Sequence, residues 1–268
     1  MIKGLYGKIR KAMIRMNWKR HSASLAVSGA IVQVPLPGMA LILAPHADDE
    51  LIGCHMYMQR SQCTAFCCAL TGSDPSEENR TIRNREFLAY CSANSIPSFI
   101  SQTDLENALT ECINNVKPDA ILLPSVVDWH PEHRMLNEVL VRVTKQMEVS
   151  PRIIWYQVSI PIPGDRVNLV LPMDKAQYRQ KWEAFRKCYP SQAKINLERF
   201  QFVEKKRIKG HFGAECFRVL SYDCWTEAVS KMKMAEDTIA DMKHSINDFA
   251  VTERSAKEMY DYVLGEEK

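Results

Sequence analysis

The sequence predicts an α/β fold: a Rossmann-like, doubly wound and mostly parallel sheet with helices on both faces, followed by a helical C-terminal extension. Two observations predict it. Short apolar runs alternate with stretches of helical spacing, and clusters of polar residues follow directly on two of these runs. Consecutive parallel strands need a crossover, usually a helix, so such alternation is typical of a parallel sheet. With 268 residues, 46% of them hydrophobic, the chain can build one large domain with an appendage.

Each predicted strand is an apolar run too short for a helix, and each predicted helix has apolar residues three or four positions apart. Strands are expected at residues 39–44, 63–70, 98–100, 120–124, 152–160 and 167–171. Helices are expected at residues 50–59, 79–93, 105–116, 132–146, 175–188 and 195–206.

The pattern changes after residue 226, where apolar residues recur at helical spacing among many charges. One or two amphipathic helices are expected there, either capping the core or forming a homo-oligomer. The chain then divides into a basic segment (1–25), an α/β domain (26–220) and a helical extension (221–268). The apolar positions of this last part are Val229, Met232, Ile239, Met242, Ile246 and Phe249.

Composition narrows the class of protein. A net charge of +3 gives no reason to expect nucleic-acid binding, and 25% charged residues is close to the globular average. The nine cysteines form no Cys-x-x-Cys pair and lie mostly in apolar stretches. Such cysteines behave as small hydrophobes in a reducing compartment, so a cytoplasmic location is expected. No apolar run is long enough to span a membrane.

The first 20 residues combine apolar and basic side chains at helical spacing. One interpretation is a helix that makes peripheral contact with an anionic membrane through residues 1–20. The other is a helix packed on the domain or on a partner, which is the ordinary role of an amphipathic surface helix. The apolar positions are Ile2, Leu5, Tyr6, Ile9, Met13 and Met16, and the basic ones include Lys3, Arg10, Lys11, Arg15, Lys19 and Arg20.

The first chemical motif, Pro45-His46-Ala47-Asp48-Asp49-Glu50, directly follows a predicted strand. It places one imidazole and three carboxylates within five residues. Unpaired carboxylates are costly to bury in an apolar core, so this cluster is expected to face a cleft. Mixed nitrogen and oxygen donors suit Zn²⁺.

The second motif, Asp128-Trp129-His130-Pro131-Glu132-His133, also follows a predicted strand. Pro131 suits the first turn of a helix, which places His130 near the cap and His133 in the first turn. The positive end of the helix dipole disfavours imidazolium, so both rings are expected to be neutral. Because the carboxyl ends of parallel strands share one edge, the two motifs can converge. Together they supply His, Asp and His, and three protein ligands with one open position are typical of a catalytic zinc site.

With both motifs in view, the chain resembles the LmbE-like, or PIG-L-like, family of zinc-dependent N-acetylglucosaminyl deacetylases. The family's His-Pro-Asp-Asp-Glu signature stands here as residues 46–50, with Ala47 in place of Pro. Its His-Pro-Asp-His signature stands here as residues 130–133, with Glu132 in place of Asp. Softer similarities lie in Arg83 and Glu86, in Asp104, and around residues 189–192 and 210–217, so the resemblance spans about residues 39–218.

The resemblance implies roles for the motif residues. His46, Asp49 and His133 would hold one Zn²⁺ ion, or another divalent metal. Asp48 would be the general base that takes a proton from water. His130 would stabilise the oxyanion or protonate the leaving amine.

Four further residues receive expected roles near the site. Arg83 and Asp104 would bind sugar hydroxyls. Trp129 would either stack on a sugar ring or pack on the helix below. Glu50 would support a metal ligand by hydrogen bonding, or cap the helix start.

The implied activity is hydrolysis of the N-acetyl group of an amino sugar or glycoconjugate. Two alternatives stay open at this point. The chain could hydrolyse another amide or ester, such as a thiol-sugar conjugate. It could also be a non-catalytic metal-binding scaffold for glycan assembly. A phosphate-binding nucleotide site is not expected, because the loop after the first strand has no glycines.

Overall fold

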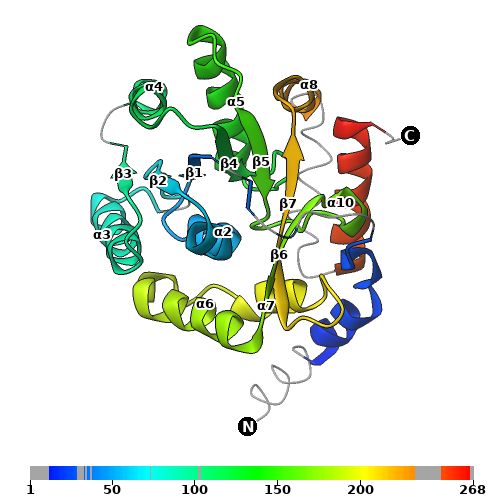
Figure 1. The fold of residues 1–268 in the computed structure, drawn as a ribbon. Coiled ribbons are helices and arrows are strands. Elements are labelled where there is room, and N and C mark those ends of the chain that lie inside the picture. Colours follow the sequence, from blue (N-terminus) through cyan, green and yellow to red (C-terminus); the bar gives the residue numbers. More distant parts are fainter. Residues whose placement is uncertain are drawn as a thin grey trace.

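The computed structural model describes residues 12–28, 33, 35, 36, 38–72, 74–101, 104–232 and 249–265, which fold around one sheet (Figure 1). Its seven strands are β1 (Ala40–Ala44), β2 (Cys63–Cys67), β3 (Ser98–Ile100), β4 (Ala120–Pro124), β5 (Arg152–Tyr156), β6 (Leu169–Met173) and β7 (Gly213–Leu220). Their order across the sheet is β3-β2-β1-β4-β5-β7-β6. Among the helices within the described ranges, none combines the length and apolar composition needed to cross a membrane.

The helices connect these strands and cover the sheet. They are α2 (Asp49–Arg60), α3 (Glu77–Ala93), α4 (Leu105–Val116), α5 (Pro131–Gln146), α6 (Lys175–Cys188), α7 (Leu197–Lys205), α8 (Tyr222–Met232) and α10 (Phe249–Leu264). Three short 3₁₀ turns lie at Ala23–Leu25, Gly164–Arg166 and Pro190–Gln192. The predicted α/β class and its mostly parallel sheet are therefore confirmed.

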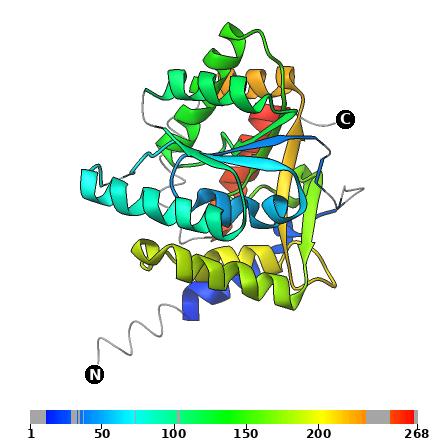
Figure 2. The ribbon, with the colours of Figure 1, turned by 60° about the vertical axis from the view of Figure 1, so that its left-hand side comes forward.

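Two apolar layers hold the sheet, one on each face. All of β1 is buried, and its residues alternate: Leu41 and Leu43 join one layer, and Ala40 and Ile42 join the other. Side chains of α4, α5, α8 and α10 complete the first layer, whereas α2, α3 and α6 complete the second. Figure 2 shows α6 lying beyond α2 and α3. Burial on both faces explains why the central strands are continuous apolar runs.

The strand β7 is missing from the sequence prediction. It runs antiparallel to both β5 and β6, so one side of the otherwise parallel sheet is mixed. Glu215 and Arg218 interrupt its apolar pattern, although both are buried. The structure permits a buried Glu215 because its carboxylate lies 2.7 Å from the ammonium of Lys181, on α6. The sequence pattern does not reveal that pairing.

The strands β2 and β5 end earlier than predicted, at Cys67 and Tyr156. The chain that follows each of them forms loops at the carboxyl edge of the sheet. In the first loop, the Cys68 and Leu70 N–H groups donate to the carbonyls of Ala44 and Pro45, at 2.8 and 3.1 Å. This loop is thereby held against the turn that carries the first motif.

The described C-terminal helices share the core of the α/β domain. The indole N–H groups of Trp225 on α8 and Trp155 on β5 both donate to the Asn137 side-chain oxygen, at 3.0 and 3.1 Å. The Tyr260 hydroxyl on α10 donates to Ser125 Oγ at 2.6 Å. The apolar faces of both helices therefore cap the core. The predicted positions 239, 242 and 246, and the side chain at 249, lie outside the described residues.

The described part of the N-terminal segment is a helix over residues 12–20, packed on the domain. Trp18 is 3% exposed and contacts Leu25 and Val203. The Arg15 side chain of the same helix lies 2.7 Å from the carboxylate of Glu198, on α7. Residues 12–20 therefore pack on the domain, which was one of the two interpretations from the sequence. Residues 1–11 lie outside the described range.

Candidate metal centre

The turn between β1 and α2 carries the first motif in a strained conformation. Asp48 has φ 133°, in a region that side-chain-bearing residues rarely adopt. Such strain costs about 1–3 kcal/mol and is concentrated at functional sites. Two local hydrogen bonds hold the turn: the His46 N–H donates to Asp49 Oδ2 at 3.0 Å, and the Asp48 N–H donates to Glu50 Oε2 at 3.1 Å.

The second motif lies between β4 and α5, as predicted. His130 is the N-cap of α5, Pro131 follows in its first turn, and the His130 Nδ1 atom accepts from the Glu132 N–H at 3.3 Å. The Asp128 carboxylate orders the preceding loop, because it accepts from the N–H groups of His130 at 2.8 Å and Ser159 at 3.1 Å.

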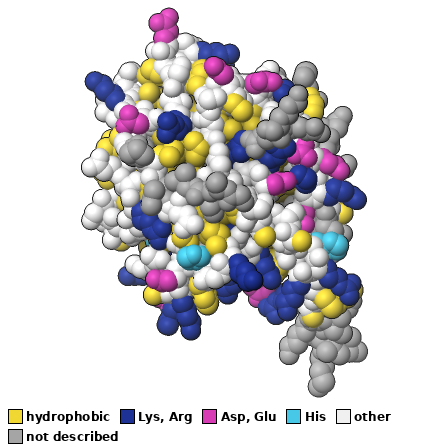
Figure 3. Space-filling view, turned by 45° about the vertical axis from the view of Figure 1, so that its right-hand side comes forward, with side chains coloured by type: hydrophobic (Ala, Val, Ile, Leu, Met, Phe, Trp, Pro, Cys, Tyr) yellow, Lys and Arg dark blue, Asp and Glu magenta, His cyan; other side chains and the backbone are white. Residues whose placement is uncertain are grey.

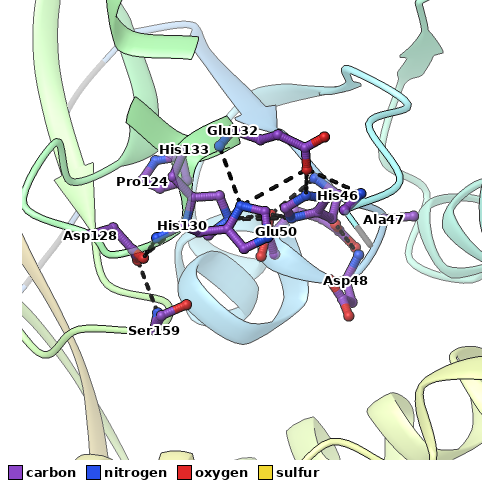
Figure 4. Close-up of polar contacts among 12 residues, drawn as sticks. His46, Ala47, Asp48, Glu50, Pro124, Asp128, His130, Glu132, His133 and Ser159 are labelled. Atoms are coloured by element: carbon purple, nitrogen blue, oxygen red, sulfur yellow. Dashed lines mark hydrogen bonds and ion pairs between the residues drawn. The ribbon is translucent and has the colours of Figure 1, made fainter. Parts of the chain in front are cut away.

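The two motifs meet at the carboxyl edge of the sheet (Figure 4). Three donor atoms form a small triangle there. His46 Nδ1 lies 3.1 Å from Asp49 Oδ2, His133 Nε2 lies 3.3 Å from that same oxygen, and the two nitrogens are 3.2 Å apart. With ligand distances of 2.0–2.2 Å, two donors on a tetrahedral zinc are about 3.3–3.6 Å apart. The triangle is therefore close to one face of such a coordination sphere.

A third imidazole lies beside this triangle. One ring nitrogen from each of His46, His130 and His133 lies within 4.8 Å of the other two. These three rings could also hold a metal ion. The hydrogen bonds of each ring distinguish between the two donor sets.

In two of the three rings, one nitrogen is held by a carboxylate. His46 Nε2 lies 2.5 Å from Glu132 Oε2, and His133 Nδ1 lies 3.1 Å from Asp128 Oδ2. A carboxylate this close favours a proton on the ring nitrogen that faces it and a lone pair on the other nitrogen, as is typical of histidines that bind metals. These lone pairs are on His46 Nδ1 and His133 Nε2, the atoms of the triangle.

His130 has the opposite arrangement. Its Nδ1 accepts a backbone hydrogen bond, so a neutral ring carries its proton on Nε2. Burial and the neighbouring charges of His133 and His46 lower the pKa of His130 to about 4, which keeps the ring neutral. His130 Nε2 is thus a hydrogen-bond donor rather than a metal ligand in this arrangement.

The prediction that both rings are neutral is wrong for His133. Burial opposes its charge, but the carboxylates of Asp128 and Asp49 outweigh burial and raise the pKa of His133 to about 10. A close pair of carboxylates has a stronger effect on this ring than the helix dipole has. His133 therefore carries a proton unless a cation replaces it.

Asp48 lies beside the triangle and outside it. Burial, followed by the charge of Asp49, raises its pKa well above the ordinary value. Arg83, on α3, donates to the Ala47 carbonyl at 3.0 Å and lies 3.4 Å from Asp48 Oδ1. Arg83 thus contacts the predicted base directly.

Glu50 lies beneath the turn and is fully buried. One carboxylate oxygen accepts from the Asp48 N–H, and the other accepts from the hydroxyl of Tyr189, at the end of α6. Burial raises the pKa of Glu50 to about 7. Glu50 supports the backbone of the turn, and Tyr189 in turn supports Glu50.

The other expected site residues have different surroundings. The Asp104 carboxylate caps α4, accepting from the N–H groups of Glu106 and Asn107 at 3.0 and 3.2 Å. Trp129 packs against the core, with its ring centroid 5.3 Å from that of His130. It therefore both packs on the domain and borders the histidines.

Three supporting residues were not assigned roles from the sequence. Asp128 and Glu132 stand inside the second motif, where acidic residues close to the two histidines were the available signal. Tyr189 is distant in sequence, and only its place in a Tyr-Pro-Ser-Gln segment marked it. The two acidic residues orient His133 and His46, and Tyr189 contacts Glu50.

Comparisons with known proteins find one similar family and several similar folds. The family model described as PIG-L, GlcNAc-PI de-N-acetylase, matches residues 41–144. No curated protein matches the chain. Among solved structures, N,N′-diacetylchitobiose deacetylase from Pyrococcus horikoshii has 15% identity and a TM-score of 0.52, over 84% of this chain and 95% of that chain.

Two further structures show how widely the fold is used. The zinc-inhibited form of teicoplanin deacetylase Orf2 has 11% identity and a TM-score of 0.51, over 68% of this chain and 98% of that chain. The 4-carboxy-2-hydroxymuconate hydratase GalB from Pseudomonas putida KT2440 has 11% identity and a TM-score of 0.55, over 69% and 96%. Since a hydratase shares the fold, the fold alone does not select the reaction.

The sequence match is more informative than the shared fold. Its span runs from β1 to the end of α5 and so contains both motifs and all the donor atoms of the triangle. Residues 41–144 of this chain therefore match the model of the PIG-L family, described as GlcNAc-PI de-N-acetylase.

Proposed function

We propose that the chain is a metal-dependent hydrolase that removes the N-acetyl group from an amino sugar or glycoconjugate. The observation that carries the proposal is the triangle of His46 Nδ1, Asp49 Oδ2 and His133 Nε2, with edges of 3.1 to 3.3 Å. The family match to a de-N-acetylase supports the class of reaction. The names of two structural neighbours, a diacetylchitobiose deacetylase and a teicoplanin deacetylase, support an acetylated sugar or glycoconjugate as substrate.

We assign His46, Asp49 and His133 as the ligands of one divalent cation, with Zn²⁺ as the first candidate. Such a cation supplies a Lewis acid that acidifies a water molecule and polarises the amide carbonyl. The protein contributes two oriented lone pairs and one carboxylate oxygen. Asp128 and Glu132 fix the rings that carry those lone pairs.

Asp48 is the general base in this proposal. Its carboxylate is buried next to the triangle without being one of its corners, and burial increases its affinity for a proton. Arg83 holds that carboxylate by an ion pair of 3.4 Å. Asp48 would take the proton from the attacking water and hold it for the leaving nitrogen.

His130 is the proposed donor to the oxygen that gains charge in the transition state. Its neutral ring carries the proton on Nε2, so it can donate to an oxyanion without first being protonated. The sequence left two roles open for His130, and the low pKa favours oxyanion stabilisation over proton donation to the amine.

Two measurements on the full chain test this proposal together. Metal analysis is expected to find about one divalent ion per chain, lost in both His46→Ala and His133→Ala. A panel of N-acetylhexosamines, free, nucleotide-linked and lipid-linked, is expected to include a substrate that releases acetate. Because one neighbour is known in a zinc-inhibited form, the metal-free chain should be reloaded with Zn²⁺, Fe²⁺, Mn²⁺ and Co²⁺ in parallel at one equivalent.

The outcomes separate the alternatives. Release of an acid other than acetate would indicate a hydrolase of another amide or ester. A bound metal ion with no hydrolysis on any glycan would favour a non-catalytic scaffold. Full metal content in the two alanine variants would show that the ligand assignment is wrong.

A further inference from the structure

The first 20 residues differ in charge from the rest of the chain. They contain seven Lys and Arg residues and no Asp or Glu, and the first acidic residue of the whole sequence is Asp48. The net charge of the complete chain is only +3. The positive charge is therefore concentrated near the N-terminal end of the sequence.

The structure fixes the described part of this segment to the domain. The helix over residues 12–20 lies against α7, with the Trp18 ring 5.6 Å from that of Phe202 and the Arg15 guanidinium bonded to Glu198 at 2.7 and 3.1 Å. Trp18 is nearly completely buried. The charged and apolar side chains of this helix therefore have a defined position on the domain.

The outward side of this helix is apolar as well as basic. Met13 is 61% exposed and Met16 is 50% exposed, and both Lys19 and Arg20 are exposed. Figure 3 shows Lys and Arg side chains gathered at the lower right of the molecule, with hydrophobic side chains between them. Large apolar side chains three residues apart, next to basic ones, are typical of a helix that lies in a membrane interface.

A groove runs beside the helix, between it and the start of α7. Apolar side chains of Ile14, Trp18, Ile195 and Leu197 line it, together with basic Arg186 and Lys194. Its one acidic side chain, Glu198, is paired with Arg15. An apolar lining with unbalanced positive charge suits a molecule that is apolar at one end and anionic at the other.

We infer that this N-terminal surface, made of Met13, Met16, Lys19, Arg20, Arg186 and Lys194, binds the surface of an anionic membrane. The basic side chains would attract the lipid headgroups, and the two methionines would enter the interface. Binding to the phosphate backbone of nucleic acid depends on charge, whereas a membrane interface also takes up exposed apolar side chains such as these two methionines. This inference is independent of the proposed function.

Vesicle co-sedimentation of the full-length chain tests the inference. Binding is expected to vesicles of phosphatidylcholine with 30% phosphatidylserine and to be absent with phosphatidylcholine alone. The double variant Lys19→Glu/Arg20→Glu should bind about ten-fold more weakly or worse, because each basic residue near such a surface contributes about a factor of five. Raising the salt from 0.1 to 0.5 M should have a similar effect.

A second variant tests the apolar part. Met13→Ser/Met16→Ser should weaken binding by about five-fold or more at 0.1 M salt, since two exposed thioether side chains no longer enter the interface. The matched controls are Met135→Ser and Lys145→Glu, two exposed residues of α5. Both controls should bind as the unchanged chain does, and the melting temperatures of all variants should agree within about 3 °C.

Three results would overturn the inference. The first is no binding to the anionic vesicles. The second is an equal loss of binding in the α5 controls, which would indicate unspecific attraction. The third is tighter binding to a duplex DNA or a single-stranded RNA than to the vesicles at equal salt, which would assign the surface to nucleic acid.

Discussion

The three histidines of the metal centre differ in which ring nitrogen is held by the protein. Glu132 bonds to Nε2 of His46, the Asp128 carboxylate lies 3.1 Å from Nδ1 of His133, and a backbone N–H donates to Nδ1 of His130. These contacts, rather than the presence of three histidines, determine which rings present a lone pair. They explain why His46 and His133 are assigned as ligands together with Asp49, while His130 is assigned as a donor.

Asp48 provides the most direct test at the residue scale. Asp48→Asn should reduce kcat by about 10²-fold or more, because the amide cannot accept the proton. Metal content should be unchanged, since Asp48 is not a corner of the triangle. Initial rates of acetate release, with metal analysis of the same sample, check this. Loss of the metal ion would instead identify Asp48 as a ligand.

The proton on His133 predicts how metal binding depends on pH. With a pKa raised to about 10, the metal-free ring is protonated across the neutral range. A cation must displace that proton, and the pKa of His46 is raised as well, so affinity should rise by about ten-fold or more per pH unit between pH 6 and 8 and fall as the pH is lowered. Chelator competition at several pH values measures this slope. An affinity that does not change with pH would mean that His133 binds no metal or is already neutral.

A substitution at Tyr189 tests whether its hydrogen bond to Glu50 stabilises the strained turn at Asp48. The hydroxyl of Tyr189 donates to Glu50, which holds the Asp48 N–H. Tyr189→Phe should lower kcat by about 10–100-fold with little change in KM, the usual cost of removing a residue that orients a site. Amide hydrogen exchange of the peptide covering residues 45–50 should become faster.

A neighbouring tyrosine supplies the control. Tyr90 is equally buried, its ring centroid lies 6.0 Å from that of Tyr189, and its hydroxyl bonds to His55 at 2.8 Å. Tyr90→Phe should cost similar stability without changing kcat or exchange at the turn. If both variants lose the same activity, general loosening of the core explains the effect, and Tyr189 has no special role.

At the scale of elements, α2 is fixed by a buried ion cluster opposite the metal centre. The Lys181 ammonium on α6 donates to the Ile52 carbonyl at 2.7 Å and to the carboxylates of Glu204 and Glu215 at 2.6 and 2.7 Å. The other oxygen of Glu215 accepts from the Met56 N–H at 2.9 Å. One cluster thus joins α2, α6, α7 and β7, and it ties the helix that begins at Asp49 to the antiparallel part of the sheet.

Removing Lys181 should be strongly destabilising. Lys181→Met leaves two buried carboxylates without their cation, so the free energy of unfolding should fall by about 3–5 kcal/mol. Urea unfolding at pH 7 measures the change, and Lys187→Met, an exposed position of the same helix, is the control. A loss below about 1 kcal/mol would show that the carboxylates take up protons or water at little cost.

At the scale of the whole molecule, the metal centre joins distant parts of the chain. It connects the β1–α2 turn to the start of α5, and Ser159 after β5 bonds to Asp128. A ligand that binds only the folded state stabilises the whole domain. The same site holds two carboxylates of like charge next to each other, those of Asp48 and Asp49.

Removal of the metal should therefore lower global stability. At a free metal concentration of 100 times Kd, binding contributes about 2.7 kcal/mol, which corresponds to a melting temperature several degrees higher. Calorimetry of the loaded chain with and without excess chelator checks this. The His133→Ala chain should show no difference between the two conditions, and a shift that persists in it would place the bound metal elsewhere.

Local patterns in the sequence predicted a large part of this architecture. The bounds of β3, β4, α4 and α6 agree with prediction, because buried runs and amphipathic spacing depend on near neighbours. The strand β7 was missed because Glu215 and Arg218 hide its apolar pattern. The sequence also predicted that both motifs follow strand ends and that His130 lies near the cap of α5.

The sequence by itself determined which donor types stand at the ends of β1 and β4, and that parallel strands would bring them to one edge. Only the tertiary structure decided the chemistry of each donor. The partner of His46 is 86 residues away and that of Glu50 is 139 residues away. A tautomer, a raised pKa and a strained φ angle depend on contacts and burial between such distant residues, and spacing along the chain carries no information about them.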